Sequence, residues 1–173
     1  MLIGTINGEF AGMAMEPLPC RTHSFEAQEL DLIDQHILSE LQFDARVSMA
    51  ELGRRVGLSA PAISERVVRL ERGGVITGYH ATVNPKAIGY PISAVVRVRP
   101  AAQQLRKIPE LALDTPEVVS CMRITGEDCF LLELHLRDMD DLEEILDRFV
   151  LFGQTTTSIV HSSPVSRRPL PLG

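Results

Sequence analysis

Polar side chains recur on one side of the segment 59–72, and their types suit contact with a polyanion. At helical spacing this segment carries an apolar stripe of Ile63, Val67 and Leu70. The opposite side and its flank carry Pro61, Ser64, Glu65, Arg69 and Arg72. Arginines hold phosphates, whereas serine and glutamate can hydrogen-bond to base edges. The pattern predicts a helix with one packed face and one face that contacts nucleic acid.

The segment before this helix carries the residues that would position it. Ser48 is expected to cap a helix over 49–56, and Gly57 can take the left-handed conformation that ends it. Gly53 has no side chain to hold two helices apart. Ser59 then caps the next helix, with Pro61 in its first turn. Glycines at 53 and 57 followed by Ile63 match the spacing of a helix-turn-helix, whose second helix enters the major groove of DNA.

Each polar residue of this unit has an expected role. We expect Pro61, Ser64 and Glu65 to reach base edges. Phosphate contacts are expected from Arg54, Arg55, Ser59 and Arg69. Two simpler alternatives stay open, because Ser59 could serve only as an N-cap and any one of the arginines could be an ordinary solvated charge.

Charge is unevenly distributed along the chain, whose net charge is −6. Residues 46–72 hold six arginines and three glutamates, a net charge of +3. Residues 92–152 hold seven basic and twelve acidic residues, a net charge of −5. DNA would therefore be attracted to the first stretch and repelled by the second.

The second half of the chain alternates between strand and helix patterns in the order β-α-β-β-α-β. Strands are expected over 92–100, 117–125, 129–137 and 155–163. One helix is expected between the first two strands, where Pro109 kinks or restarts it, and a second helix, which begins at Asp138, is expected before the last strand. Met139 is expected to point inward, and Gly153 to end the second helix. In the first strand Ile92, Ala94, Val96 and Val98 would lie under the helices, whereas Val95, with Leu131, would lie on the opposite face.

These patterns predict an α+β protein, with an N-terminal winged helix-turn-helix followed by a ferredoxin-like βαββαβ domain. Residues 1–28 would be a disordered tail and 29–84 the DNA-binding domain, its first helix starting at Leu30 and its wing a short strand before Asn84. A hinge would span 85–91, the second domain 92–164, and a tail 165–173.

Composition argues against several other classes of protein. No apolar run is long enough to span a membrane and the N-terminus lacks a secretory signal, so a cytoplasmic location is expected, without a membrane partner. The three cysteines form no CxxC pair, which argues against a disulfide scaffold or a zinc site. Cys121 and Cys129 are expected to be buried thiols. No metal, cofactor or catalytic residue is expected.

Residues 30–163 resemble the Lrp/AsnC family of transcriptional regulators almost throughout, in "LDLIDQHILSELQFDAR", "SMAELGRRVGLSAPAISERVVRLERGGVITGYHATVNPKAIG", "PEVVSCMRITGEDCFLLELHLRDMDDLEEILDRF" and "TTTSIVHSSPV". The resemblance implies a hinge strand and a ligand-sensing domain that dimerises through its sheet face. Three features depart from the family's pattern. They are the tail 1–28, Pro109 inside the first helix of the second domain, and Glu127 and Cys129 at positions where many members carry aspartates.

The turn "TGED" is a candidate effector site. Gly126 lets the backbone pass close to a ligand, neighbouring N–H groups can meet a carboxylate, and Glu127 or Asp128 can meet an ammonium. The alternative is a turn that only closes a hairpin. The resemblance implies an effector here, with Thr156 and Ser158 of the last strand as a wall, and amino acids or their relatives as the ligand.

The sequence thus predicts a regulator that is not an enzyme, binds palindromic operators in double-stranded DNA, and associates with the nucleoid. It would be a homodimer, or a tetramer or octamer built from dimers. Two alternatives are a broad architectural role on DNA and an enzyme like the sirohaem decarboxylases, which would use His80, His135 and His161.

Overall fold

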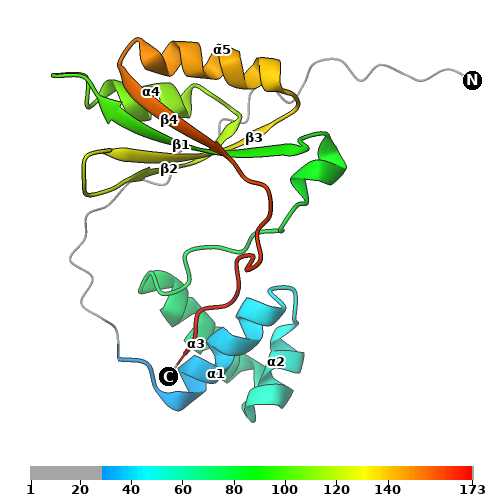
Figure 1. Ribbon diagram of the computed structural model, residues 1–173. Helices are drawn as coiled ribbons and strands as arrows, with labels where there is room; N and C mark the ends of the chain where they lie inside the picture. Colours follow the sequence, from blue (N-terminus) through cyan, green and yellow to red (C-terminus); the bar gives the residue numbers. More distant parts are fainter. Residues whose placement is uncertain (1–28, 173) are drawn as a thin grey trace, which may run out of the picture.

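The computed structural model describes residues 29–172, so the tail predicted for 1–28 lies outside the described residues. Three helices form the first unit: α1 (Leu32–Phe43), α2 (Met49–Val56) and α3 (Ala60–Arg72). They pack around one core (Figure 1), whose fully or nearly fully buried residues are Ile37, Leu38, Leu41, Val47, Leu52, Ile63, Val67 and Leu70.

Local sequence signals set the ends of these helices. Asp31 caps α1 in a reciprocal box with Asp34, so α1 begins two residues after the expected Leu30. The Ser48 hydroxyl accepts a hydrogen bond from the Glu51 N–H at 3.2 Å. Gly57 has φ of 80°, a left-handed conformation in which α2 ends as predicted.

The wing that follows α3 is a loop. The strand predicted there is wrong, because residues 75–84 pair with no strand in the described part of the chain. β-branched and aromatic residues favour extended backbone, but a strand also needs a partner to receive its hydrogen bonds. A short 3₁₀ helix, η1 (Pro85–Ile88), then leads into the sheet, and the Asn84 side chain caps it.

The second unit is a four-stranded antiparallel sheet with two helices, which confirms the predicted ferredoxin-like fold. Its elements are β1 (Ile92–Pro100), α4 (Lys107–Leu113), β2 (Val118–Arg123), β3 (Phe130–Leu136), α5 (Met139–Val150) and β4 (Gly153–Ile159). The strand order is β2-β3-β1-β4, so β1 lies in the middle beside both β3 and β4.

Strict alternation separates the two faces of this sheet. Both helices cover one face (Figure 1), where Ala94, Val96 and Val98 are buried as predicted. Leu132, opposite Val96, lies in the same core. Val95 and Leu131 face the other side and are half-buried. The uncovered face, called the outer face below, therefore keeps aliphatic side chains in contact with solvent in the single chain.

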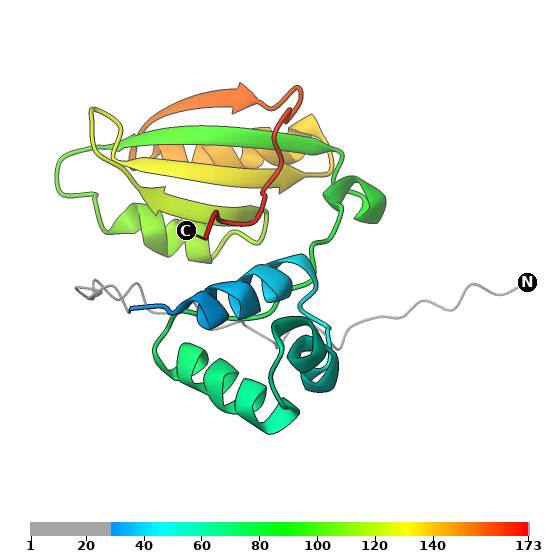
Figure 2. The same ribbon diagram turned by 90° about the horizontal axis from the view of Figure 1, so that it is seen from below.

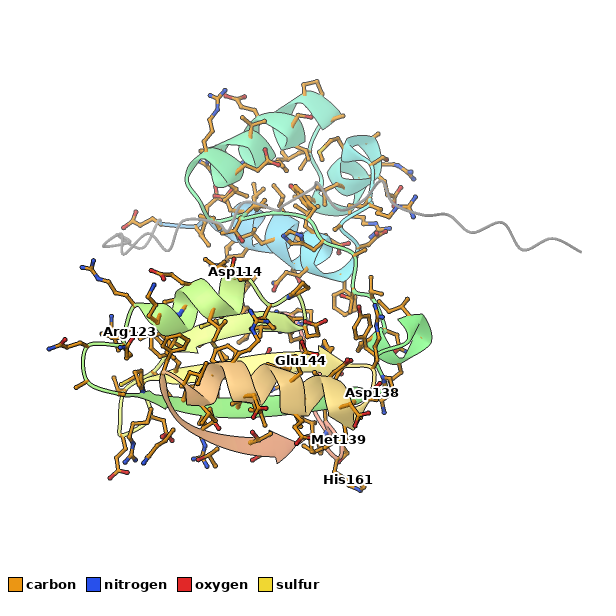
Figure 3. The ribbon with its side chains drawn as sticks, turned by 90° about the horizontal axis from the view of Figure 1, so that it is seen from above. Asp114, Arg123, Asp138, Met139, Glu144 and His161 are labelled. Atoms are coloured by element: carbon orange, nitrogen blue, oxygen red, sulfur yellow. The ribbon has the colours of Figure 1, made fainter. Side chains whose placement is uncertain are left out.

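Several local expectations for this unit are wrong. Met139 is 52% exposed, because it lies in the first turn of α5 beside the cap Asp138 (Figure 3), before the helix reaches the sheet. Helix α5 ends at Val150, and Gly153 instead begins β4, where a side chain would collide with the carbonyl of Arg99. Cys121 is exposed, because it lies on the edge strand β2, although its ladder partner Leu132 is buried under the helices.

Pro109 restarts the helical pattern, as one of the two predicted outcomes. Helix α4 begins at Lys107, so Pro109 falls in its first turn, where a missing N–H breaks no helical hydrogen bond. No helix between residues 29 and 172 has the length and apolar character needed to cross a bilayer.

Candidate functional site

Helices α2 and α3 approach closely at Gly53. A Cβ at Gly53 would lie 2.5 Å from the carbonyl oxygen of Leu58 in the connecting turn. The Leu58 N–H donates to the Gly53 carbonyl at 2.9 Å. Only a residue without a side chain allows this contact, so Gly53 fixes how α3 leaves the turn.

Helix α3 divides into the two faces that its sequence predicts. Ile63, Val67 and Leu70 are at most 4% exposed. Pro61, Glu65 and Arg69 lie on the exposed side. Ser64, Glu65, Val68, Arg69 and Arg72 line one hollow on this side. We call this exposed side of α3 the reading face. It combines a hydrogen-bond acceptor, a hydroxyl and two guanidinium groups.

The two serines of α3 differ in what their hydroxyls do. Ser59 occupies the N-cap position, yet its side chain makes no capping hydrogen bond, so its hydroxyl is available to an outside partner. The Ser64 hydroxyl donates to the Ala60 carbonyl at 2.9 Å. It therefore has acceptor capacity, but no free proton, to offer a base edge.

The two arginines of α2 already have carboxylate partners. Arg54 pairs with Glu51, and its side chain is 76% exposed. Arg55 donates to Glu40 at 2.7 Å and to Glu51 at 2.9 Å, and these two hydrogen bonds, that to Glu40 first, raise its pKa. Exposed pairs of this kind contribute little to stability, so a phosphate can compete for either guanidinium.

A buried carboxylate links α1 to the reading face. Asp34 is 1% exposed and accepts from Arg66 Nη1 at 2.8 Å and from Arg69 Nη2 at 2.5 Å. Arg66 also donates to Asp31 at 2.7 Å, and hydrogen bonds to Asp31 and then to Asp34 raise the Arg66 pKa. Arg69 holds Asp34 through one of five N–H donors, so the others remain available to DNA.

Sequence reasoning missed Asp34. A signal was present, because Asp34 lies three residues after the cap Asp31 and between Ile33 and Ile37, on the side of α1 that faces the core. A carboxylate in such a position needs a cationic partner from another helix, and the arginines of α3 supply it.

The turn "TGED" joins β2 to β3 and lies beside two arginines of β1. Gly126 has φ of 114°, and a side chain there would meet no atom within 4 Å. Glu127 pairs with Arg99, and an Asp128 oxygen lies 3.8 Å from a nitrogen of each of Arg97 and Arg99. Both predicted ammonium ligands are therefore paired already, and the sequence analysis missed both arginines.

Only part of the predicted effector set comes together in the single chain. Thr156 is opposite Arg97 in the β1–β4 ladder, so it lies in the same row as the arginine that neighbours Asp128. Ser158 is opposite Val95, further along the outer face. Both side chains are exposed. The arrangement offers two guanidinium groups and hydroxyls to a carboxylate, and leaves its outer side open.

The histidines of the enzymatic alternative are spread between the two units. His80 lies in the wing, against the cavity beside α1. His135 faces outward from β3 and lies 2.9 Å from the Ser93 hydroxyl. Among residues 29–172, no group of three metal-binding side chains comes together.

Comparison with known proteins gives matches across both units. Residues 30–71 match the model of the AsnC-type helix-turn-helix domain, and residues 93–170 match that of the Lrp/AsnC ligand binding domain. The chain is similar to the HTH-type transcriptional regulator LrpC of Bacillus subtilis, with 33% identity over 78% of this chain and 93% of LrpC.

Two of the similar solved structures are complexes with L-methionine. One is a transcriptional regulator of Neisseria meningitidis, with a TM-score of 0.77, 29% identity, and coverage of 83% of this chain and 97% of the other. Another is a feast or famine regulatory protein of Mycobacterium tuberculosis, with a TM-score of 0.78, 34% identity, and coverage of 84% and 100%.

Proposed function

We propose, from the premise that this chain belongs to the Lrp/AsnC family of transcriptional regulators, that residues 29–84 bind operator DNA under the control of a small molecule held by residues 92–164. Residues 85–91 are the hinge in this proposal. The observation that carries it is the geometry of α2 and α3, where Gly53 sets a close turn and α3 turns a polar face outward.

Contacts to DNA are divided between the two helices. Glu65 and Ser64 accept hydrogen bonds from base edges, Glu65 from a cytosine amine, and Pro61 packs against a base at the start of α3. Ser59, Arg54, Arg55 and Arg69 contact phosphates. The free hydroxyl of Ser59 and the exposure of Arg54 support these roles.

The protein acts as a homodimer on this proposal, with the outer faces of two sheets packed together. Val119 is 56% exposed on β2, Met122 opposite Leu131 is 39% exposed, and Leu131 itself and Val95 of β1 are half-buried on the same face. Apolar side chains gathered on a sheet face that the chain's own helices leave uncovered are typical of an interface. Two-fold symmetry makes the operators palindromic, with half-sites one helical turn or a multiple of it apart.

The effector is an amino acid or a close relative, bound at the turn "TGED". The carboxylate meets Arg97 or Arg99 and the N–H groups beside Gly126, whereas Asp128 or Glu127 exchanges its arginine for the ammonium group. Thr156 and Ser158 supply a wall, and a second subunit closes the open side. The L-methionine complexes of two similar proteins support this ligand class.

Selection of bound duplexes from a random library, followed by mapping of occupancy across the genome, tests the proposal. We expect imperfect palindromes and a limited set of promoters in the cytoplasmic nucleoid. Occupancy without a shared motif would instead indicate an architectural role. Failure to bind any duplex would refute the DNA-binding assignment.

A thermal-shift screen of the amino acids tests the effector. The ligand should stabilise the unaltered protein and leave the Gly126→Trp variant unaffected, because the indole would occupy the space that is open beside Gly126. Equal stabilisation of both proteins would place the effector site elsewhere.

A further inference from the structure

The segment after β4 returns to the DNA-binding unit. In Figure 1 it runs from the end of β4 to α1, and Figure 2 shows it passing over the outer face of the sheet on the way. An Arg167 nitrogen lies 3.9 Å from a Glu133 oxygen on β3. Residues 167–172, called the strap below, therefore contact both units. Among residues 29–172, the hydrophobic core of the first unit and that of the second unit have no residue in common.

A cavity beside α1 receives the strap. It has a volume of about 600 Å³ and lies between α1, the wing and the strap. Its walls include Leu38 and Leu41 of α1, and Val75 and Ile76 of the wing. Leu172 packs against the same hydrophobic core as these residues. The strap thus covers apolar surface that the three helices leave open.

Two hydrogen bonds fix the strap to α1. The Leu170 N–H donates to Gln42 Oε1 at 2.6 Å, and Gln42 Nε2 donates to the Leu170 carbonyl at 3.2 Å. Pro169 and Pro171 flank Leu170 and restrict the strap to extended conformations, and neither has an N–H to donate. Gln42 therefore binds the one backbone donor between two prolines, as a neighbouring strand would.

We propose that the strap fixes the orientation of the DNA-binding unit relative to the sheet, and thereby sets which half-site spacings the protein accepts. This rests on the proposed function as a dimeric DNA-binding regulator. The restriction needs only the hydrogen bonds of the strap to Gln42 and its covalent link to β4, because a partner sheet on the outer face would replace the contact of Arg167 with Glu133. A unit held by the segment 77–91 alone could sample many orientations, whereas a second attachment restricts them. In a dimer this restriction applies to both reading faces, and so to the distance and rotation between them.

Docking of the strap can be tested by fluorescence, because the chain has no tryptophan. Leu172→Trp places the only indole at the cavity, and Val165→Trp places it on the exposed stretch just before the strap. We expect Leu172→Trp to emit at shorter wavelength and to resist acrylamide quenching. Adding Gln42→Ala, which removes both hydrogen bonds, should raise its quenching toward that of Val165→Trp. Equal quenching of the two single-tryptophan proteins would refute docking.

The spacing role is tested with two duplexes that carry the same half-sites. One has the selected spacing, and the other has about five additional base pairs, half a helical turn, which rotates one half-site to the opposite side. Full-length protein should prefer the first. Leu172→Asp and deletion of 167–173 should lower the ratio of the two affinities about tenfold, an ordinary size for a coupling between sites. Val165→Asp, with the same added charge outside the strap, should keep the ratio.

The outcomes separate the two proposals. If the strap variants bind DNA with an unchanged spacing preference, the spacing role is wrong and the DNA-binding proposal stands. If the unaltered protein binds no duplex, both are wrong, although the tryptophan proteins still report whether the strap docks.

Discussion

Asp34 of α1 and Arg69 of α3 are joined by a hydrogen bond of 2.5 Å between a buried carboxylate and a guanidinium on the reading face. The same carboxylate holds Arg66, so the first helix positions two arginines of the third. The charge that DNA would meet at Arg69 is therefore oriented from inside the protein before any DNA is bound.

Replacing Asp34 should destabilise the DNA-binding unit. Asp34→Ala leaves both arginines without this partner, although Arg69 remains half-exposed and Arg66 keeps Asp31. Breaking a fully buried pair costs about 3–5 kcal/mol, and partial exposure of the arginines reduces the expected loss to about 1–3 kcal/mol in the free energy of unfolding. Chemical denaturation measures it. Ser39→Ala, at an exposed position of the same helix, is the control, and equal stabilities would contradict the argument.

A methyl group at Gly53 should separate α2 from α3. In Gly53→Ala the new Cβ meets the Leu58 carbonyl at 2.5 Å, and backbone there cannot yield as a flexible side chain would. Overpacking of this kind costs about 1–3 kcal/mol, and DNA binding should weaken as α3 turns away. Gly73→Ala is the matched control, because Gly73 has φ of −76°, which alanine adopts freely. Thermal unfolding and duplex binding should distinguish the two variants.

Removing the two arginines of α2 should weaken binding to all DNA sequences alike. Arg54→Ala with Arg55→Ala should reduce the slope of log affinity against log salt by about 1 for each phosphate that the protein no longer neutralises. Arg106→Ala with Arg123→Ala removes the same charge from exposed positions of the other unit and should keep the slope. A double α2 variant that binds like the unaltered protein at every salt concentration would exclude these arginines from the interface.

The outer face of the sheet should hold the dimer together. Leu131→Asp places a carboxylate amid Val95 and its neighbours, so its burial against a second sheet would be unfavourable. We expect a monomer at micromolar concentration by analytical ultracentrifugation. Leu151→Asp, at a 77% exposed position after α5, should remain a dimer. A dimeric Leu131→Asp protein would place the interface elsewhere.

The hydroxyl of Tyr79 in the wing should lose its proton at a higher pH than an ordinary tyrosine. Partial burial, and then its hydrogen bond of 2.9 Å to Glu71, raise the pKa of Tyr79 from 10.0 to about 12. The pKa of Tyr79 is higher in the folded protein than in the unfolded chain, so protonated Tyr79 stabilises the folded state. This contribution is fully present below pH 10 and is lost as pH rises through about 12. Ultraviolet titration of phenolate should show a late step that Tyr79→Phe removes and Tyr90→Phe keeps.

Several predictions that depend only on residues close together in the sequence are confirmed. Ser48, Gly57 and the stripe of Ile63, Val67 and Leu70 behave as predicted, because a cap, a left-handed turn and a helical face need only a few successive residues. Alternation likewise predicted which side of β1 is buried. The wing strand was wrong because its stability depends on a partner that local sequence does not identify.

The contacts that the sequence did not reveal join distant positions. Asp34 with Arg69, Arg99 with Glu127, and Gln42 with Leu170 each need the fold before the two residues meet. Charge and spacing indicate that Glu127 could bind an ammonium group, but they do not show that Arg99 is already there. The roles of Pro61, Glu65, Thr156 and Ser158 remain predictions.

The position of β1 in the middle of the sheet has a consequence for the order of folding. Its neighbours β3 and β4 come later in the chain, with Val96 opposite both Leu132 and Thr157. The three helices of the first unit, in contrast, are consecutive. Short-range contacts form faster than long-range strand pairs. In refolding, helical signal from the first unit should therefore recover before β1 is paired. Until β1 is paired its aliphatic residues are exposed to solvent, so the protein should aggregate most readily in that interval.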